Sequence, residues 1–140
     1  MSKVAVVYWS GTGNTKAMAD AVEAGAAGKG AEVTMFGPSD FTPDKVSEFN
    51  GIAFGCPAMG AEVLEETEYE PMFSAVEGSL SGKKIALFGS YGWGDGQWMR
   101  DWEERCQAAG AVMAYDAVMA NGMPGEDALD ECRSLGSSLA

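Results

Sequence analysis

A chain of 140 residues, 46% of them hydrophobic, is long enough to bury a sizeable core, and we expect residues 1–140 to form a single domain. Its 21 acidic and 9 basic residues give a formal net charge of −12, which excludes a nucleic-acid-binding role because such proteins need a basic surface. The chain has no histidine and only 3 widely spaced cysteines, so histidine-based catalysis is excluded and neither a disulfide framework nor a cysteine metal site is expected.

No apolar run approaches the roughly 18 residues that a membrane-spanning helix needs. The first three residues lead directly into a strand-like run and do not resemble a signal peptide. We therefore expect a cytoplasmic protein with no membrane segment. The acidic charge has two interpretations, which are solubility alone or an acidic face that docks onto basic partner proteins.

Apolar, strand-like runs alternate with helix-like runs along the chain. The predicted strands span residues 3–8, 32–36, 51–56, 83–89 and 111–118. The first, third and fourth runs are nearly continuously apolar, as in strands that helices cover on both faces. The second run alternates between polar and apolar residues and the fifth is interrupted by Asp116, so we place these two strands at the edges of the sheet.

Helical spacing of apolar residues fills the segments between the strands. The predicted helices span residues 14–27, 68–78 and 97–109, with a short helix after Pro43 and a last helix that carries Leu129, Cys132, Leu135 and Leu139. Gly25, Gly28 and Gly30 are predicted to close the first helix. The alternation predicts an α/β fold, a doubly wound five-stranded parallel sheet of order 2-1-3-4-5 with helices on both faces.

Ligands of such sheets bind beyond the carboxyl ends of the strands, near the point where the strand order reverses. The segments at that edge are residues 9–15, 57–66, 90–96 and 119–126. The first of them reads Trp-Ser-Gly-Thr-Gly-Asn-Thr and leads into the first predicted helix, whose N-terminal amides favour an anion. Gly11 and Gly13 allow the backbone to wrap closely, while hydroxyl and amide side chains add donors, so this loop predicts a phosphate site made of neutral groups.

Other phosphate-binding motifs do not match this loop. The P-loop and the dinucleotide fingerprint both need a glycine where this chain has Lys16, a residue that we expect to point to solvent. A phosphatase loop that begins at Cys56 would need arginine at position 62, which is Glu62, and a phosphorelay receiver would need acidic residues after the first and third strands. A capped turn alone would need one Ser or Thr and not three hydroxyls. A site without a lysine suits a phosphate that is held and not transferred.

Two further loops offer surfaces for a flat ring. Met59 follows the third strand, and methionine sulfur packs well against aromatic rings. Trp93 stands between Gly92 and Gly94, where it suits neither a helix nor a central strand, and a tryptophan on such a loop is typical of a stacking surface. Trp98 and Trp102 have helical spacing and are predicted core residues. A phosphate cradle with two platforms favours FMN as the ligand.

The three loops together resemble the short-chain flavodoxins over essentially the full length of the chain. The resemblance assigns Ser10–Thr15 to the phosphate, Ala58–Gly60 to the inner face of the flavin and Ser90–Gly94 to its outer face. It implies tight noncovalent FMN and one-electron transfer between low-potential partner proteins. It also implies that Glu62 meets N3 of the ring and that Asn121 lies near the ring or the ribityl chain.

One residue departs from the pattern of this family, since Ala61 stands where a polar residue or glycine is common. The predicted cofactor-binding residues are Trp9, Ser10, Gly11, Thr12, Gly13, Asn14, Thr15, Pro57, Ala58, Met59, Gly60, Ala61, Glu62, Ser90, Tyr91, Gly92, Trp93, Gly94 and Asn121. We predict no catalytic and no metal-binding residues. The predicted partners of this monomer are redox proteins with basic docking surfaces.

The charge also predicts the redox behaviour. Acidic surroundings should penalise the anionic, fully reduced flavin, so that the second electron leaves at low potential, while a neutral semiquinone is stabilised by the Gly60 carbonyl. The alternative function is a small FMN-dependent reductase similar to the quinone reductases, which would need a second substrate site over the ring where Trp93 is expected. A non-redox module that binds a phosphorylated ligand would leave Met59 and Trp93 unexplained.

Overall fold

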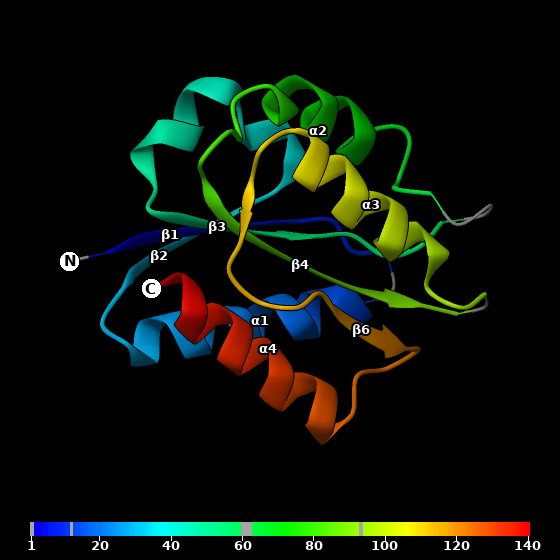
Figure 1. The fold of residues 1–140 in the computed structure, drawn as a ribbon. Coiled ribbons are helices and arrows are strands. Elements are labelled where there is room, and N and C mark those ends of the chain that lie inside the picture. The colour runs from blue at the N-terminus through cyan, green and yellow to red at the C-terminus, as the bar shows by residue number, and fades with distance from the viewer. Residues whose placement is uncertain (1, 12, 60–62, 93) are drawn as a thin grey trace.

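The computed structural model describes the chain except for Met1, Thr12, residues 60–62 and Trp93. Its centre is a parallel sheet of order β2-β1-β3-β4-β5, with a further strand, β6, that also pairs with β4 (Figure 1). The strands are β1 (Lys3–Tyr8), β2 (Glu32–Phe36), β3 (Gly51–Gly55), β4 (Lys84–Tyr91), β5 (Val112–Met113) and β6 (Val118–Asn121). The predicted strand order is confirmed.

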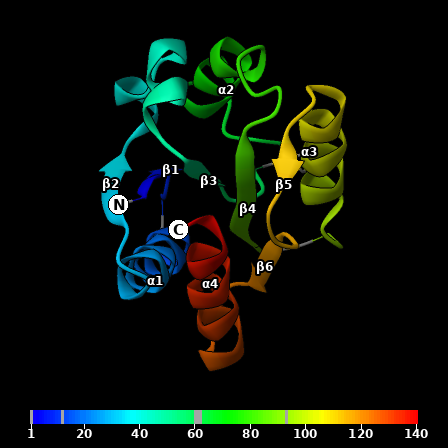
Figure 2. The same ribbon diagram turned by 60° about the vertical axis from the view of Figure 1, so that its left-hand side comes forward.

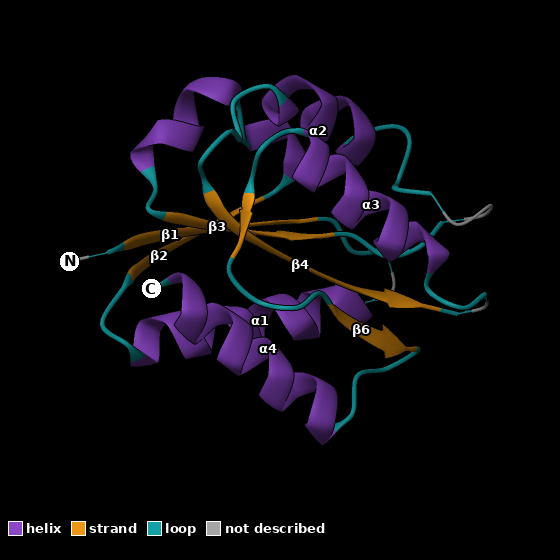
Figure 3. Ribbon diagram, in the orientation of Figure 1, coloured by secondary structure: helices purple, strands orange, loops and turns teal. Residues whose placement is uncertain are grey.

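Helices cover both faces of the sheet. They are α1 (Asn14–Gly28), α2 (Tyr69–Glu77), α3 (Gln97–Ala108) and α4 (Glu126–Leu139), with the short 3-10 helices η1 (Pro38–Asp40) and η2 (Pro43–Glu48) between β2 and β3. Helices α1 and α4 lie on one face, and α2 and α3 lie on the other (Figure 3). The doubly wound arrangement is therefore confirmed, and the short helix predicted after Pro43 is the 3-10 helix η2.

The core has one half on each face of the sheet. Val4 and Val6 of β1 pack on the side of α1 and α4, and the alternate residues Ala5 and Val7 pack on the opposite side. All four side chains have no exposed surface, which explains why this strand is a continuous apolar run. The tryptophans at helical spacing, Trp98 and Trp102, are both buried beneath α3, so their prediction as core residues is confirmed.

The single strand predicted over residues 111–118 is wrong, because the chain forms two short strands there. β5 pairs with Lys84 and Ile85 of β4, and β6 pairs with residues 88–91 of the same strand, so that four residues, 114–117, lie opposite only two. Figure 2 shows β5 and β6 as separate arrows. Within this segment Asp116 is exposed and the Ala117 amide donates a hydrogen bond to the Glu103 carboxylate of α3. The extra residues let a charged side chain reach solvent beside a covered sheet, which a regular strand would not allow.

Helices α1 and α4 approach each other through two glycines. A Cβ on Gly25 would lie 1.9 Å from the carbonyl oxygen of Arg133, and a Cβ on Gly136 would lie 2.0 Å from that of Val22. The prediction that Gly25 closes the first helix is therefore wrong, since α1 continues to Gly28 and Gly25 is a packing residue. The Ser137 hydroxyl donates to the Gly25 carbonyl oxygen over 3.1 Å and adds a polar contact to the same crossing.

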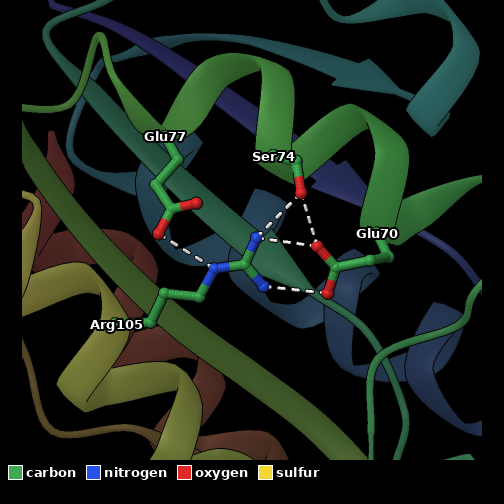
Figure 4. A network of polar contacts seen from close by, with 4 residues as sticks. All are labelled: Glu70, Ser74, Glu77 and Arg105. Atoms are coloured by element: carbon green, nitrogen blue, oxygen red, sulfur yellow. Dashed lines mark hydrogen bonds and ion pairs between the residues drawn. The ribbon is translucent and has the colours of Figure 1, made fainter.

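On the other face, Arg105 joins α3 to α2 (Figure 4). Its guanidinium donates two hydrogen bonds to the Glu70 carboxylate, at 2.8 and 2.7 Å, and another of 2.9 Å to Glu77. It also donates to the Ser74 hydroxyl and lies 4.9 Å from the centre of the Phe73 ring. These hydrogen bonds from Arg105 lower the pKa of Glu70, so the pair stays charged at neutral pH.

The glycine crossing predicts an unusual response to alanine. Within a helix, Gly→Ala normally stabilises by about 0.5–1 kcal/mol, but Gly25→Ala should destabilise the fold by about 1–3 kcal/mol because its Cβ has no space against α4. Gly28→Ala is the matched control, since Gly28 ends the same helix and a Cβ there meets nothing within 4 Å. Urea unfolding followed by circular dichroism measures both. Equal stability of the two variants would contradict close packing at Gly25.

Candidate functional site

The loops that follow β1, β3 and β4 meet at the carboxyl edge of the sheet, where sequence analysis places the ligand. They enclose a cavity of about 240 Å³. The residues that line it are Trp9, Gly11, Asn14, Pro57, Ala58, Met59, Ser90, Tyr91, Gly92 and Gly122. The sequence therefore predicts three loops that the fold brings together around one cavity.

The first loop leaves the start of α1 open toward an anion. Gly13, which precedes the helix, has the left-handed backbone angle φ of 96° and has no side chain that could cap the helix. The Ser10 hydroxyl accepts hydrogen bonds from the amides of Gly13 and Lys16 at 3.1 and 3.3 Å, which tightens the turn. Amides at a helix N-terminus carry a partial positive charge that suits a phosphate, and Gly13 is needed because other residues rarely adopt this φ.

The side chains that flank this turn have separate partners. Thr15, which is only 1% exposed, lies with its hydroxyl 3.1 Å from the Ser90 hydroxyl and so joins α1 to β4. The Lys16 Nζ lies 3.0 Å from a carboxylate oxygen of Asp20 on the exposed side of α1, and both side chains are about half exposed. The expectation that Lys16 points to solvent is confirmed, and its charge is balanced by a carboxylate.

The second loop begins at the end of β3 and is tied to β4. The amides of Cys56 and Ala58 donate to the carbonyl oxygens of Phe88 and Ser90 at 3.2 and 3.0 Å. Further along, Met59 and Val63 form a short antiparallel bridge with hydrogen bonds of 2.9 and 3.2 Å. This bridge fixes the backbone of Met59 at the wall of the cavity.

Glu65 is a buried residue of the same loop that sequence analysis does not identify. Its carboxylate accepts hydrogen bonds from the Thr67 hydroxyl and from the amides of Thr67, Glu68 and Tyr69. Burial alone would raise the pKa of this carboxyl group, but these hydrogen bonds outweigh burial and lower the pKa to about 2. An acidic residue just before a predicted helix is a signal that could reveal it, since carboxylates favour helix N-termini.

The loop after β4 and the end of β6 close the cavity. Tyr91 packs against Trp98 with ring centroids 5.5 Å apart, and its carbonyl oxygen accepts the Gly122 amide over 2.8 Å. Gly122 has a φ of 70° and lines the cavity, although sequence analysis names only its neighbour Asn121. The Asn-Gly pair is the signal that could indicate it, because this dipeptide favours turns with positive φ.

The remaining predicted residues differ in where they lie. Asn121 pairs with Tyr91 across β6 and β4 and lines a neighbouring groove. The predicted site residues that the structure describes but that do not line the cavity are Ser10, Gly13, Thr15, Gly94 and Asn121. Predicted site residues outside the described part of the chain are Thr12, Gly60, Ala61, Glu62 and Trp93. The predictions for these five residues stay predictions.

The neighbouring groove, of about 700 Å³, runs along β6 and the start of α4 and has a different character. Its lining includes four carboxylates, those of Asp116, Glu126, Asp127 and Glu131. These charges would repel a phosphate, so the larger groove does not suit a phosphorylated ligand. The smaller cavity combines the open amides of α1 with Trp9, Met59 and Tyr91 along its walls, and this combination fits the phosphate and the flat ring of FMN.

Other kinds of site find no support in the described residues. Outside the gaps at 1, 12, 60–62 and 93, no group of three or more acidic or cysteine side chains could hold a metal ion. The cysteines Cys56, Cys106 and Cys132 are free and buried, and burial raises the pKa of each thiol to about 12. No described helix has the length and hydropathy to cross a membrane.

Comparison with known proteins identifies the family of this chain. Residues 6–136 match the flavodoxin family model. The chain is 44% identical to a flavodoxin of Clostridium beijerinckii over 96% of this chain and 97% of the relative, and 46% identical to that of Megasphaera elsdenii over 98% of each. The solution structure of two-electron reduced Megasphaera elsdenii flavodoxin superposes with a TM-score of 0.90 at 45% identity over 97% of both chains. The chain therefore belongs to the flavodoxin family, and it is an FMN-dependent electron-transfer protein and not an enzyme.

Proposed function

We propose that this chain holds FMN in the cavity between the loops after β1, β3 and β4, as a single domain over residues 1–140. The observation that carries the proposal is the cavity itself, which joins an open helix N-terminus to walls formed by Trp9, Met59 and Tyr91. When bound, FMN supplies the chemistry of one-electron acceptance and release. The residues of the chain bind, orient and shield the cofactor.

In this proposal the first loop binds the phosphate. The amides at the start of α1 donate to it, and the turn that aims them is held by the Ser10 hydroxyl through Gly13 and Lys16. Asn14 lines the cavity and adds a side-chain amide, and Thr12 is proposed to add a hydroxyl. Neutral donors suffice because the phosphate is held and is never transferred.

The ring lies between the second and third loops in this proposal. Met59 packs on one face, held in place by its bridge to Val63. Trp93 follows Gly92, which lines the cavity, and is proposed to cover the other face. Glu62 is proposed to bond N3 of the ring, and Asn121 to lie near its edge. These contacts exclude water from the ring and leave no room for a second substrate above it, which favours the carrier over the reductase.

The acidic charge is proposed to act on the cofactor and on its partners. Carrying a net charge of −12, the chain opposes a second negative charge on the ring, so one-electron exchange at low potential is favoured. The groove along β6 and α4 presents four carboxylates beside Met119 and Met123, which are 40% and 82% exposed. A redox protein with a basic surface and an apolar centre fits this groove, with the chain as a cytoplasmic monomer.

The phosphate loop predicts that affinity depends on the phosphate group. FMN should bind the apoprotein at least about 100-fold more tightly than riboflavin, because two charge-assisted hydrogen bonds at about 1.5 kcal/mol each amount to this factor. Ser10→Ala should reduce the ratio, since it removes the acceptor that aims the turn. Isothermal titration calorimetry with both ligands measures the ratio. Equal affinities for FMN and riboflavin would exclude a phosphate site in this loop.

The stacking role of Trp93 predicts a change in fluorescence. Trp93→Ala should raise flavin emission and weaken FMN binding by about 1–3 kcal/mol, by analogy with bases stacked on aromatic side chains. Trp93→Phe is the matched control, because it keeps an aromatic ring and should keep most of the quenching. Fluorescence titration of the apoprotein measures both effects. An alanine variant that stays dark and binds FMN as well as the original would show that another residue covers the ring.

The proposed docking groove predicts a salt-dependent rate. Electron transfer to cytochrome c, a basic haem protein, should slow as salt rises, since exposed charges are screened beyond about 8–10 Å. The double variant Asp116→Asn and Asp127→Asn should slow the low-salt rate about threefold or more, whereas Glu32→Gln and Glu48→Gln, around the opposite sheet edge at β2, should have little effect. Stopped-flow absorbance measures these rates. Equal effects of the two double variants would place docking elsewhere.

A further inference from the structure

We propose that Glu65 is a positioning residue for the cofactor, one that holds the Met59–Val63 bridge, and therefore Met59, at the wall of the cavity. This inference rests on the proposed function, in which Met59 packs against the flavin. Glu65 touches neither the cavity nor any of its lining residues in the hydrogen bonds described above, so it acts through the loop. The contacts of Glu65 with α2 and with the end of β3 explain how it acts on Met59.

The loop that carries Met59 is held differently at its two ends. Before the bridge, the amides of Cys56 and Ala58 are bonded to β4, which is the centre of the sheet. After the bridge, the chain leaves the sheet and reaches α2 within a few residues. The polar anchor of this second end is Glu65, which is 5% exposed and follows the buried Leu64.

Glu65 is bonded in two directions. Its carboxylate accepts the amides of Thr67, Glu68 and Tyr69 at 2.9, 2.7 and 3.0 Å, together with the Thr67 hydroxyl. Its own amide donates to the Cys56 sulfur over 3.4 Å, which ties the second end of the loop to the first. One residue therefore connects the start of α2, the end of β3 and the chain that leads out of the bridge.

The start of α2, to which Glu65 is bonded, is itself bonded to the sheet. Tyr69, the first residue of α2, is fully buried, and its hydroxyl donates to the carbonyl oxygen of Val7 in β1 over 2.7 Å. The Glu70 amide donates to the Glu65 carbonyl oxygen at 2.8 Å, so both the side chain and the backbone of Glu65 are fixed on the helix. A buried carboxylate with this many donors costs much to leave unpaired, so the position of the chain at Glu65 is well determined.

The consequence for Met59 follows from the short distance along the chain. Val63 lies two residues before Glu65 and is paired with Met59 in both directions of the bridge. If Glu65 loses its hold on α2, Val63 gains freedom, and Met59 gains it through the bridge. A less fixed Met59 would shield the flavin less well. The binding free energy of the flavin would then change by different amounts in its oxidised and reduced forms, because the two carry different charge.

The test compares Glu65→Gln with Glu66→Gln. Glu66 is exposed and adjacent, so the control makes the same change in net charge one residue away. The first measurement is amide hydrogen exchange at Met59 and Val63 in the apoprotein, which needs no cofactor. We expect exchange about tenfold faster in Glu65→Gln, a factor that corresponds to 1.4 kcal/mol of lost protection, and no change in Glu66→Gln.

The second measurement is the pair of one-electron midpoint potentials of bound FMN, together with its dissociation constant. We expect Glu65→Gln to change the potentials and weaken FMN binding about tenfold, and Glu66→Gln to leave both near those of the original. If both variants bind no FMN while exchange at Met59 still differs, the proposed function fails and the anchor stands. If Glu65→Gln lowers only the free energy of unfolding, with exchange and potentials equal to the control, Glu65 merely caps α2 and the inference is overturned.

A milder variant covers the case in which Glu65→Gln does not fold. Thr67→Val removes the hydroxyl that donates to Glu65 and leaves the backbone amides in place. It should change exchange at Met59 and Val63 in the same direction by a smaller factor. Unchanged exchange in this variant, with the hydroxyl bond lost, would also overturn the role of Glu65 as the anchor of the bridge.

Discussion

An anion that is held by backbone amides is held only as well as those amides are aimed, and several contacts fix the direction of the amides at the start of α1. The direction of the first turn of α1 is set by the left-handed Gly13 and by the Ser10 hydroxyl. The helix is also fixed by α4, which lies on the same face of the sheet and which Gly25 allows to come close (Figure 3). Thr15 completes the attachment by bonding to Ser90 of β4. The crossing of α1 and α4 at Gly25 therefore contributes to the cavity although it lies away from it.

The sequence predicts those features that depend on residues close together along the chain. The buried strands are found from their apolar runs, and a phosphate loop is predicted because its donors and glycines are consecutive. The division of the last strand into β5 and β6 is missed because it depends on how residues 114–117 meet β4 and Glu103. Gly25 is misassigned for the same reason, since its partner Arg133 lies on a helix at the other end of the chain.

The acidic side chains differ in whether a basic side chain lies beside them. Several basic side chains lie against carboxylates, as Lys16 does with Asp20 on α1, and Arg105 with Glu70 and Glu77 between α2 and α3. Such pairs cancel locally and contribute little field at a distance. The carboxylates around the groove of β6 and α4 include Asp116 and Asp127, which add to one another beside the cavity. The groove of β6 and α4 thus carries several of the acidic side chains of the chain.

The second loop of the cavity is supported on both sides of the Met59–Val63 bridge. The end of β3 ties one side of the Met59–Val63 bridge to the sheet. The other side reaches α2 through Glu65, and the next residues of α2 include Glu70, which Arg105 binds from α3. The wall of the cavity is therefore supported by the sheet and by the two helices on one face. The position of Met59 at the wall of the cavity therefore depends on the sheet and on α2 and α3 together, and not on the loop alone.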